Sequence, residues 1–216
     1  MSDRWSRLAP LTGVLFALIV VAAAISGGGE TPKASDSAAK VVVYYAKHRS
    51  EIETAGILFA LAFLVLVLFA GALRSYLRST GGADGLGTLV LAGAVLMAAG
   101  AIGVTALEYG LAHNLYDFTP EAAKTLNFIS SEMFLPVLAG GFIFGLCAGL
   151  AILRGAALPT WLGWAAIVIG VAALVPPVSF PALLALLVWS VVAAVLMYQR
   201  QPAMASGTGA QEPQVV

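Results

Sequence analysis

Three glutamates stand where apolar sequence gives way to polar sequence, and they are the residues best suited to chemistry. Glu53 lies 21 residues before Arg74. Glu132 lies 22 residues before Arg154, and Glu108 follows the start of its own apolar run by 22 residues. Because a helix rises about 1.5 Å per residue, each carboxylate should lie roughly 32 Å from the opposite end of its helix. The spacing predicts one acidic layer at the outer edge of a hydrocarbon slab about 30 Å thick.

An acidic layer of this kind could bind a cation, relay protons or hold a cationic head group. His113 and Asp117 lie in the polar sequence that follows Glu108. Glu132 is of most interest, because apolar residues surround it and an ionisable group near lipid depth is usually turned inward and partnered. We therefore single out Glu132, Glu108, Glu53 and His113 as candidate ligand or ion-binding residues. The alternative interpretation is that these residues only mark where the helices leave the membrane.

The sequence lacks the residue patterns that haem binding, zinc binding, disulfide formation and serine catalysis require. His48 and His113 lie at or beyond the outer boundary, so neither suits an axial haem ligand inside a bundle, and their positions show no zinc-ligand spacing. Cys147 is the only cysteine, which excludes an internal disulfide and favours a buried packing thiol. The serines at membrane depth have no histidine there to activate them. We predict no catalytic residue, no metal and no cofactor.

Composition indicates a membrane protein. The 216 residues are 60% hydrophobic and 10% charged, whereas a soluble domain carries about 25% charged residues. The formal net charge is zero, so there is no basic field to attract nucleic acid. Apolar runs of nearly 20 residues predict an all-α polytopic membrane helix bundle, formed by residues 1–200. The expected partners are the lipid bilayer and either a second copy of the chain or another membrane protein.

Six transmembrane spans are expected, at about 8–25, 54–73, 86–107, 133–153, 161–175 and 182–198. An amphipathic helix at about 36–52, capped by Ser35 or Asp36, should lie on the outer surface. Residues 201–216 are polar and predict a disordered cytoplasmic tail.

Two segments leave alternatives open. The first apolar run, 8–25, is either a retained span or a signal peptide with a small-residue exit at Ala24-Ile25-Ser26. Its length favours the retained span. Thr119, Pro120 and Glu121 form a good helix start, and the helix that begins there could run straight into the fourth span.

The fourth span carries the strongest packing signals. Gly141, Gly145 and Gly149 recur every four residues, so they form one stripe that a second helix can approach closely. We expect this span at the centre of the bundle, with the stripe packed either within one chain or between two. Pro136 lacks an amide and should bend the helix one turn beyond Glu132, which could open a small outward-facing cavity there.

Basic and aromatic residues set the expected orientation. The short connections after the second and fourth spans carry arginine as their only basic residue, at Arg74, Arg78 and Arg154. An aromatic belt at the same boundary is expected from Trp5, Trp161, Trp164, Tyr76 and Tyr198. We therefore predict both termini in the cytoplasm.

One turn carries a resemblance. Leu158-Pro159-Thr160-Trp161-Leu162-Gly163-Trp164, with Arg154-Gly155 before it and Val168-Ile169-Gly170-Val171 after it, resembles the turn into the fifth helix of a large group of uncharacterised bacterial six-helix membrane proteins. Val41-Val42-x-Tyr44-Tyr45 and the stretch 127–136 are also similar to that group. The resemblance covers most of residues 8–200. It implies six spans in a bacterial plasma membrane and implies no activity.

These patterns favour a non-enzymatic integral membrane protein, an accessory or structural component of the plasma membrane. The alternative is a small transporter or channel for a cation, a proton-coupled solute or a lipid, with Glu132, Glu108 and Glu53 lining an outward-facing mouth. A cavity beside Glu132 would favour this alternative, and a Glu132 that faces lipid or bulk water would count against it. A membrane enzyme acting on lipid would need a polar cluster that the sequence does not show.

Overall fold

The computed structural model describes residues 8–27, 29, 31–33, 35–79, 84–155 and 158–200. Within these ranges the chain forms helices and contains no strand, which confirms the all-α prediction. The basic start, 1–7, and the predicted tail, 201–216, lie outside the described residues.

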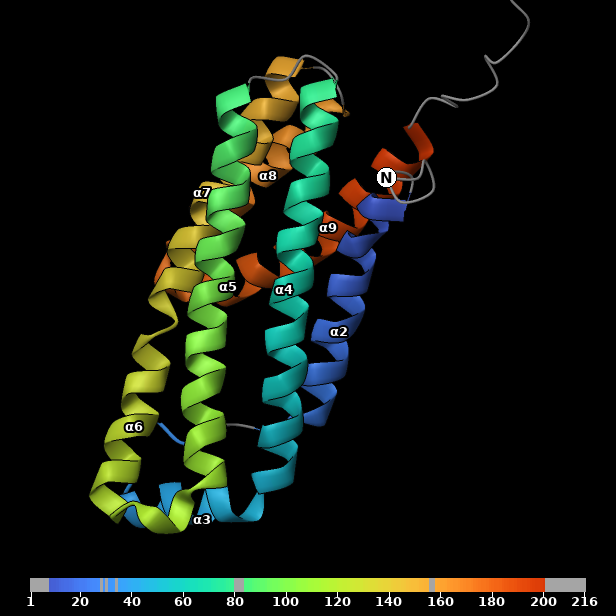
Figure 1. The fold of residues 1–216 in the computed structure, drawn as a ribbon. Helices are drawn as coiled ribbons and strands as arrows, with labels where there is room; N and C mark the ends of the chain where they lie inside the picture. The colour runs from blue at the N-terminus through green and yellow to red at the C-terminus, as the bar shows by residue number, and fades with distance from the viewer. Residues whose placement is uncertain are drawn as a thin grey trace, which may run out of the picture.

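The helices follow one another with short connections. They are η1 (Ala9–Leu11), α2 (Thr12–Ser26), α3 (Ala38–Lys47), α4 (Arg49–Ser79), α5 (Asp84–His113), η2 (Leu115–Asp117), α6 (Pro120–Glu132), α7 (Leu135–Gly155), α8 (Thr160–Ala173), η3 (Pro176–Val178) and α9 (Ser179–Arg200). Figure 1 shows α2, α4 and α5 side by side, with α3 lying across one end of α4 and α5. At the other end, α9 returns obliquely to meet α2.

Within the described ranges, five segments are long and apolar enough to cross a membrane. They are Ala9–Ser26, Arg49–Ser79, Gly85–His113, Pro120–Gly155 and Pro176–Arg200. The prediction of a helical bundle with several helices able to cross a membrane is thereby confirmed. The predicted fifth span corresponds to α8, whose 14 residues reach only about 21 Å, less than the hydrocarbon thickness of about 30 Å.

Helix α7 lies between α5 and α8. The most apolar window of Pro120–Gly155 is 56% buried, against 28 to 39% in the other four candidate spans. On its α5 side, a Cβ added to Gly93 would lie 2.6 Å from the amide nitrogen of Phe144 and 2.8 Å from the carbonyl oxygen of Gly140. Since real Cβ atoms do not approach backbone this closely, these glycines set the separation of α5 and α7.

The glycine stripe on α7 faces α8 of the same chain. A Cβ on Gly145 would lie 2.7 Å from the carbonyl oxygen of Ala166, and a Cβ on Gly149 would overlap the carbonyl of Gly163. Gly141 has only ordinary contacts, 3.7 Å or longer. Of the two arrangements left open by the sequence, the intrachain one therefore accounts for Gly145 and Gly149.

Helix α2 is an integral part of the bundle. A Cβ on Gly13 would lie 2.8 Å from the Phe69 ring and 2.9 Å from the carbonyl oxygen of Ser190. Phe16, one turn later, is buried in the main apolar core. These contacts join α2 to α4 and α9, and its interpretation as a retained span stays a prediction.

A second, smaller core lies at the end of the molecule where α3 crosses. It is built from Val41, Tyr45, Ile52, Leu111, Ala112, Leu115 and Ala123. We call α3, η2, α6 and the adjoining ends of α4 and α5 the cap.

The predicted surface helix corresponds to α3 and is shorter than predicted, because the chain turns at His48 and residues 49–52 already belong to α4. The N-cap residue of α3 is Ser37, whose Oγ accepts a hydrogen bond from the amide of Lys40 at 3.3 Å.

The helix that begins at Pro120 ends at Glu132 and does not run straight into the fourth span. Thr119 caps α6 as expected, accepting from the amide of Ala122 at 3.3 Å. The chain then turns at Met133 and Phe134 before α7 begins at Leu135. Pro136 cannot donate the amide that would continue the helical ladder, so it occupies the first turn of a new helix, where no amide is needed.

Candidate functional site

A cavity of about 130 Å³ lies where the two apolar cores meet. On α4 its walls include Ile52 and Phe59, just before the main core begins at Ala62. On α5 its walls are Thr105 and Glu108, which lie between the main core and the core of the cap. The cavity therefore occupies the boundary between the apolar bundle and the cap.

Among the described residues that line this cavity, Glu108 supplies the only charged side chain. It is partly buried. Within the part of the chain that the structure describes, its carboxylate has no hydrogen bond and no ion pair. Removing a charge from water without a partner is costly. A positively charged group beside the Glu108 carboxylate would offset this cost.

Tyr44 and Tyr45 of α3 close the cavity from the cap side. Their rings meet edge to face, with centroids 5.4 Å apart. The hydroxyl of Tyr45 donates to Oδ1 of Asn127 at 3.0 Å, and that of Tyr44 donates to the carbonyl of Gly29 at 3.5 Å. A phenol has one proton to donate, so neither hydroxyl is free to donate to a ligand.

Both phenols stay neutral. Burial raises the pKa of Tyr45 well above its usual value, and the nearby Glu108 carboxylate raises it further. The pKa of Tyr44 is also raised, first by burial and then by Glu108 and Glu51. The aromatic wall is therefore uncharged, and Glu108 sets the sign of the cavity.

The connection between α2 and α3 forms the last wall, through Gly27, Gly29 and Thr31. Gly29 has a positive φ of 86°, a conformation that glycine adopts without strain. Further along, the carbonyl of Pro32 accepts from Nδ2 of Asn127 at 3.0 Å. The connection is thus fastened to α6 beside the cavity.

Asn127 is the organising residue that the sequence did not single out as a site. It is 4% exposed and links α3, α6 and the connection after α2. Ser130, also buried, donates to its backbone carbonyl at 2.8 Å. A signal was present, because Ala123, Asn127 and Ser130 recur at helical spacing on one face of α6.

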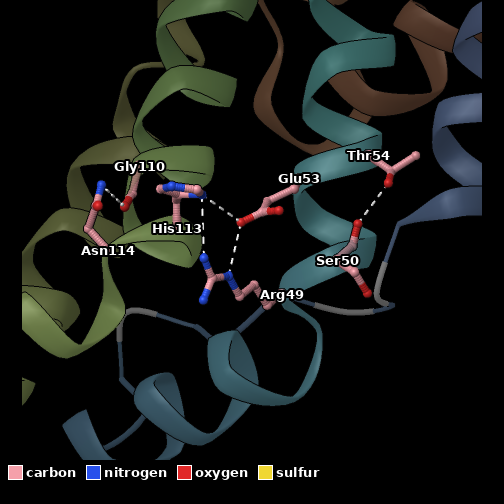
Figure 2. Close-up of polar contacts among 7 residues, drawn as sticks. All are labelled: Arg49, Ser50, Glu53, Thr54, Gly110, His113 and Asn114. Carbon is pink, nitrogen blue, oxygen red and sulfur yellow. Dashed lines mark hydrogen bonds and ion pairs between the residues drawn. The ribbon is translucent and has the colours of Figure 1, made fainter.

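Glu53 and His113 form a separate surface cluster with Arg49 (Figure 2). Oε1 of Glu53 accepts from Nε of Arg49 at 3.0 Å and lies 3.1 Å from Nδ1 of His113. The same Nδ1 lies 3.4 Å from a terminal nitrogen of Arg49. Nδ1 can donate to Glu53 when protonated or accept from Arg49 when not, but never both. The cluster ties the start of α4 to the end of α5.

Glu132 belongs neither to the cavity nor to the surface cluster of Glu53, His113 and Arg49. Its side chain is exposed, and it does not line the cavity. The next residue, Met133, packs toward α5, where a Cβ on Gly103 would meet its Cε at 2.8 Å. Pro136 likewise packs on Gly100 of α5. Of the four candidate residues, only Glu108 faces the cavity, Glu53 and His113 pair with each other, and Glu132 stands apart.

Metal binding finds little support in the described ranges, where no three histidine, cysteine, aspartate or glutamate side chains gather closely enough to hold an ion. The two histidines each pair with a glutamate. Nδ1 of His48 lies 2.6 Å from Oε2 of Glu51, three residues away on the first turn of α4.

The fold and the cavity together define a class: an α-helical protein with several membrane-crossing helices and a small cap that borders an acidic, aromatic cavity. Comparisons with protein-family models, with curated proteins and with solved structures found no match to this chain. The resemblance of the 158–164 turn to uncharacterised six-helix membrane proteins stays a prediction.

Proposed function

We propose that this chain is a non-enzymatic protein of a bacterial plasma membrane, an accessory component that binds a positively charged ligand at Glu108 in an outward-facing cap. One observation carries the proposal: a partly buried carboxylate lines a cavity and has no partner among the described residues. An ionisable group at membrane depth is by default a candidate functional site. A carboxylate whose desolvation is not offset inside the protein is suited to a cation from outside it.

The proposal includes six spans with both termini inside. The basic residues Arg74, Arg78, Arg154 and Arg200 lie at the ends of α4, α7 and α9 that are remote from the cap. Arginine concentrated in short connections favours the cytoplasmic side. Trp161 and Trp164, both largely exposed, lie on the first turns of α8 near the same boundary, where an aromatic belt is expected.

Binding without transport is supported by the packing of the bundle beyond the cavity. Backbones meet through Gly93 and Gly140 between α5 and α7, and through Gly145 and Gly149 between α7 and α8. The alternative, a small transporter, would keep Glu108 as its first ligand and would need these contacts to separate. The exposed position of Glu132 counts against the version in which that residue lines the mouth.

The test is thermal unfolding of the purified chain in a neutral detergent. The probes are Na⁺, K⁺, Ca²⁺ and tetramethylammonium, with ionic strength held constant by N-methyl-D-glucammonium, a cation too large for the cavity. Wild type is compared with Glu108→Gln and with Glu132→Gln, the matched control at an exposed glutamate.

We expect at least one probe to raise the midpoint of wild type and of Glu132→Gln in a saturable manner, and to leave Glu108→Gln unchanged. Without a probe, Glu108→Gln should be at least as stable as wild type, because the unpartnered charge is gone. Equal responses of wild type and Glu108→Gln to every probe would overturn the proposal. Uptake of the bound probe into proteoliposomes, lost in Glu108→Gln, would favour the transporter instead.

A further inference from the structure

The walls of the Glu108 cavity differ from those of a metal site. Besides Glu108 they carry three aromatic side chains, Tyr44, Tyr45 and Phe59. Calcium requires six to eight oxygen ligands, and magnesium gives up its water reluctantly. A single carboxylate supplies at most two of these oxygens, so it is a poor substitute for a full coordination shell.

The hydroxyl protons of Tyr44, Tyr45 and Thr105 are already donated within the protein. Thr105 Oγ1 donates within its own helix, toward the carbonyls of Ala101 and Ile102 at 3.0 and 3.1 Å. Tyr44 reaches the carbonyl of Gly29. A primary ammonium brings three N–H donors that need acceptors, whereas a quaternary ammonium brings none. Ile52, Ala55 and Phe59 make much of the lining apolar. The cavity thus favours a cation that needs a counter-charge and apolar contact rather than several hydrogen bonds.

Aromatic faces attract such cations. A cation within about 6 Å of a ring centroid gains from the ring quadrupole, and quaternary ammonium ligands are commonly held in cages of this kind. The volume also fits, because an engineered cavity of about 150 Å³ takes up benzene, and this cavity measures about 130 Å³. A guest of about six non-hydrogen atoms is indicated.

We infer that the ligand is a small quaternary ammonium group, held by the Glu108 carboxylate against Tyr44 and Phe59, with the buried Tyr45 ring packed behind Tyr44. This inference rests on the proposed function and names its ligand class. The group could belong to a free solute or to a lipid head group, because the cavity lies at the boundary between the apolar bundle and the cap.

The experiment is calorimetric titration of the full chain with tetramethylammonium, choline, methylammonium and K⁺, in a detergent without ammonium groups. The variants are Glu108→Gln, Tyr44→Leu and Phe59→Leu. Phe63→Leu is the matched control, since Phe63 lies one turn further along α4, contacts Phe16 edge to face and does not line the cavity.

Tetramethylammonium and choline should bind most tightly, methylammonium more weakly and K⁺ most weakly. Tyr44→Leu and Phe59→Leu should each weaken tetramethylammonium binding by about 2- to 30-fold. Phe63→Leu should change it by less than about 2-fold, and Glu108→Gln should abolish it. Loss of affinity in Phe63→Leu equal to that in Phe59→Leu would overturn the aromatic cage.

The outcomes separate the inference from the proposed function. If K⁺ in this titration, or Ca²⁺ in the thermal-unfolding test, binds in a Glu108-dependent manner and the ammonium probes do not, the inference is wrong and the proposed function stands. If no probe binds through Glu108, both are wrong.

A second arm identifies the source of the group. Tetramethylammonium is titrated in nanodiscs of phosphatidylglycerol alone and of phosphatidylglycerol with phosphatidylcholine. Weaker apparent binding in the mixed discs supports a lipid head group as the occupant, and equal binding supports a free solute.

Discussion

The phenol of Tyr45 donates a hydrogen bond of 3.0 Å to Oδ1 of Asn127, 82 residues further along the chain. Both side chains are buried. Because Nδ2 of Asn127 also donates to the carbonyl of Pro32, one amide side chain joins α3, α6 and the connection after α2. This junction holds in place two of the walls that enclose Glu108.

Tyr45→Phe should weaken the cap. The change keeps the ring and removes the donor, which leaves Oδ1 of Asn127 buried without its partner. An unsatisfied buried polar group costs about 1–3 kcal/mol, and we expect a fall of that size in the free energy of unfolding, measured by denaturation in detergent. Tyr116→Phe is the matched control, because Tyr116 is 85% exposed. Equal stability of the two variants would contradict the role of the junction.

The same residue predicts a pH dependence. Burial raises the pKa of Tyr45 in the folded chain, whereas an unfolded tyrosine ionises near pH 10. The stabilisation from a neutral Tyr45 is therefore complete below about pH 10 and declines as pH rises above it. The difference in unfolding midpoint between wild type and Tyr45→Phe should be widest near pH 8 and narrow from about pH 10 to 11. A difference that grows in this range would show that the phenol ionises while folded.

Gly93→Ala should separate α5 from α7. The new Cβ would lie 2.6 Å from the amide nitrogen of Phe144, and the backbone cannot move aside as a side chain can. Overpacking of this kind costs about 1–3 kcal/mol. Gly71→Ala is the control, because a Cβ there has no atom within 4 Å, and replacing a helical glycine gains about 0.5–1 kcal/mol. Thermal midpoints should fall for the first variant and hold or rise for the second.

Cysteine labelling checks the orientation. In a Cys147→Ala background, Tyr116→Cys places a thiol on the cap and Ser79→Cys places one at the far end of α4, and both positions are exposed. A membrane-impermeant maleimide added to intact cells should label Tyr116→Cys alone, and Ser79→Cys only after permeabilisation. The reverse pattern would put the cap in the cytoplasm.

Glu53→Gln should leave both stability and cation binding nearly unchanged. Glu53 pairs with Arg49 and His113 on the surface, and exposed ion pairs contribute little to stability. We expect the tetramethylammonium response to match that of wild type. A response as weak as that of Glu108→Gln would mean that Glu53, rather than Glu108, sets the charge at the site.

Local sequence predicted the helical elements well where short-range chemistry decides them. Thr119 caps α6 through its own side chain, and the apolar runs yield helices long enough to cross a membrane. Prediction was weaker where neighbouring polar side chains compete to cap the same helix. Asp36 was a candidate cap for α3, but it accepts from the amide of Lys33 and pairs with Lys40 at 2.8 Å, which leaves Ser37 as the cap.

The sequence by itself predicts how deep each carboxylate lies along its helix, whereas the tertiary structure decides which way each carboxylate faces. Counting residues predicts that Glu53, Glu108 and Glu132 lie near one level, because the rise along a helix is constant. Which carboxylate faces a cavity depends on the rotation of each helix about its axis. That rotation is set by contacts between distant segments, such as Gly93 against Gly140 and Tyr45 against Asn127. Only these contacts turn Glu108 toward the cavity and leave Glu132 exposed.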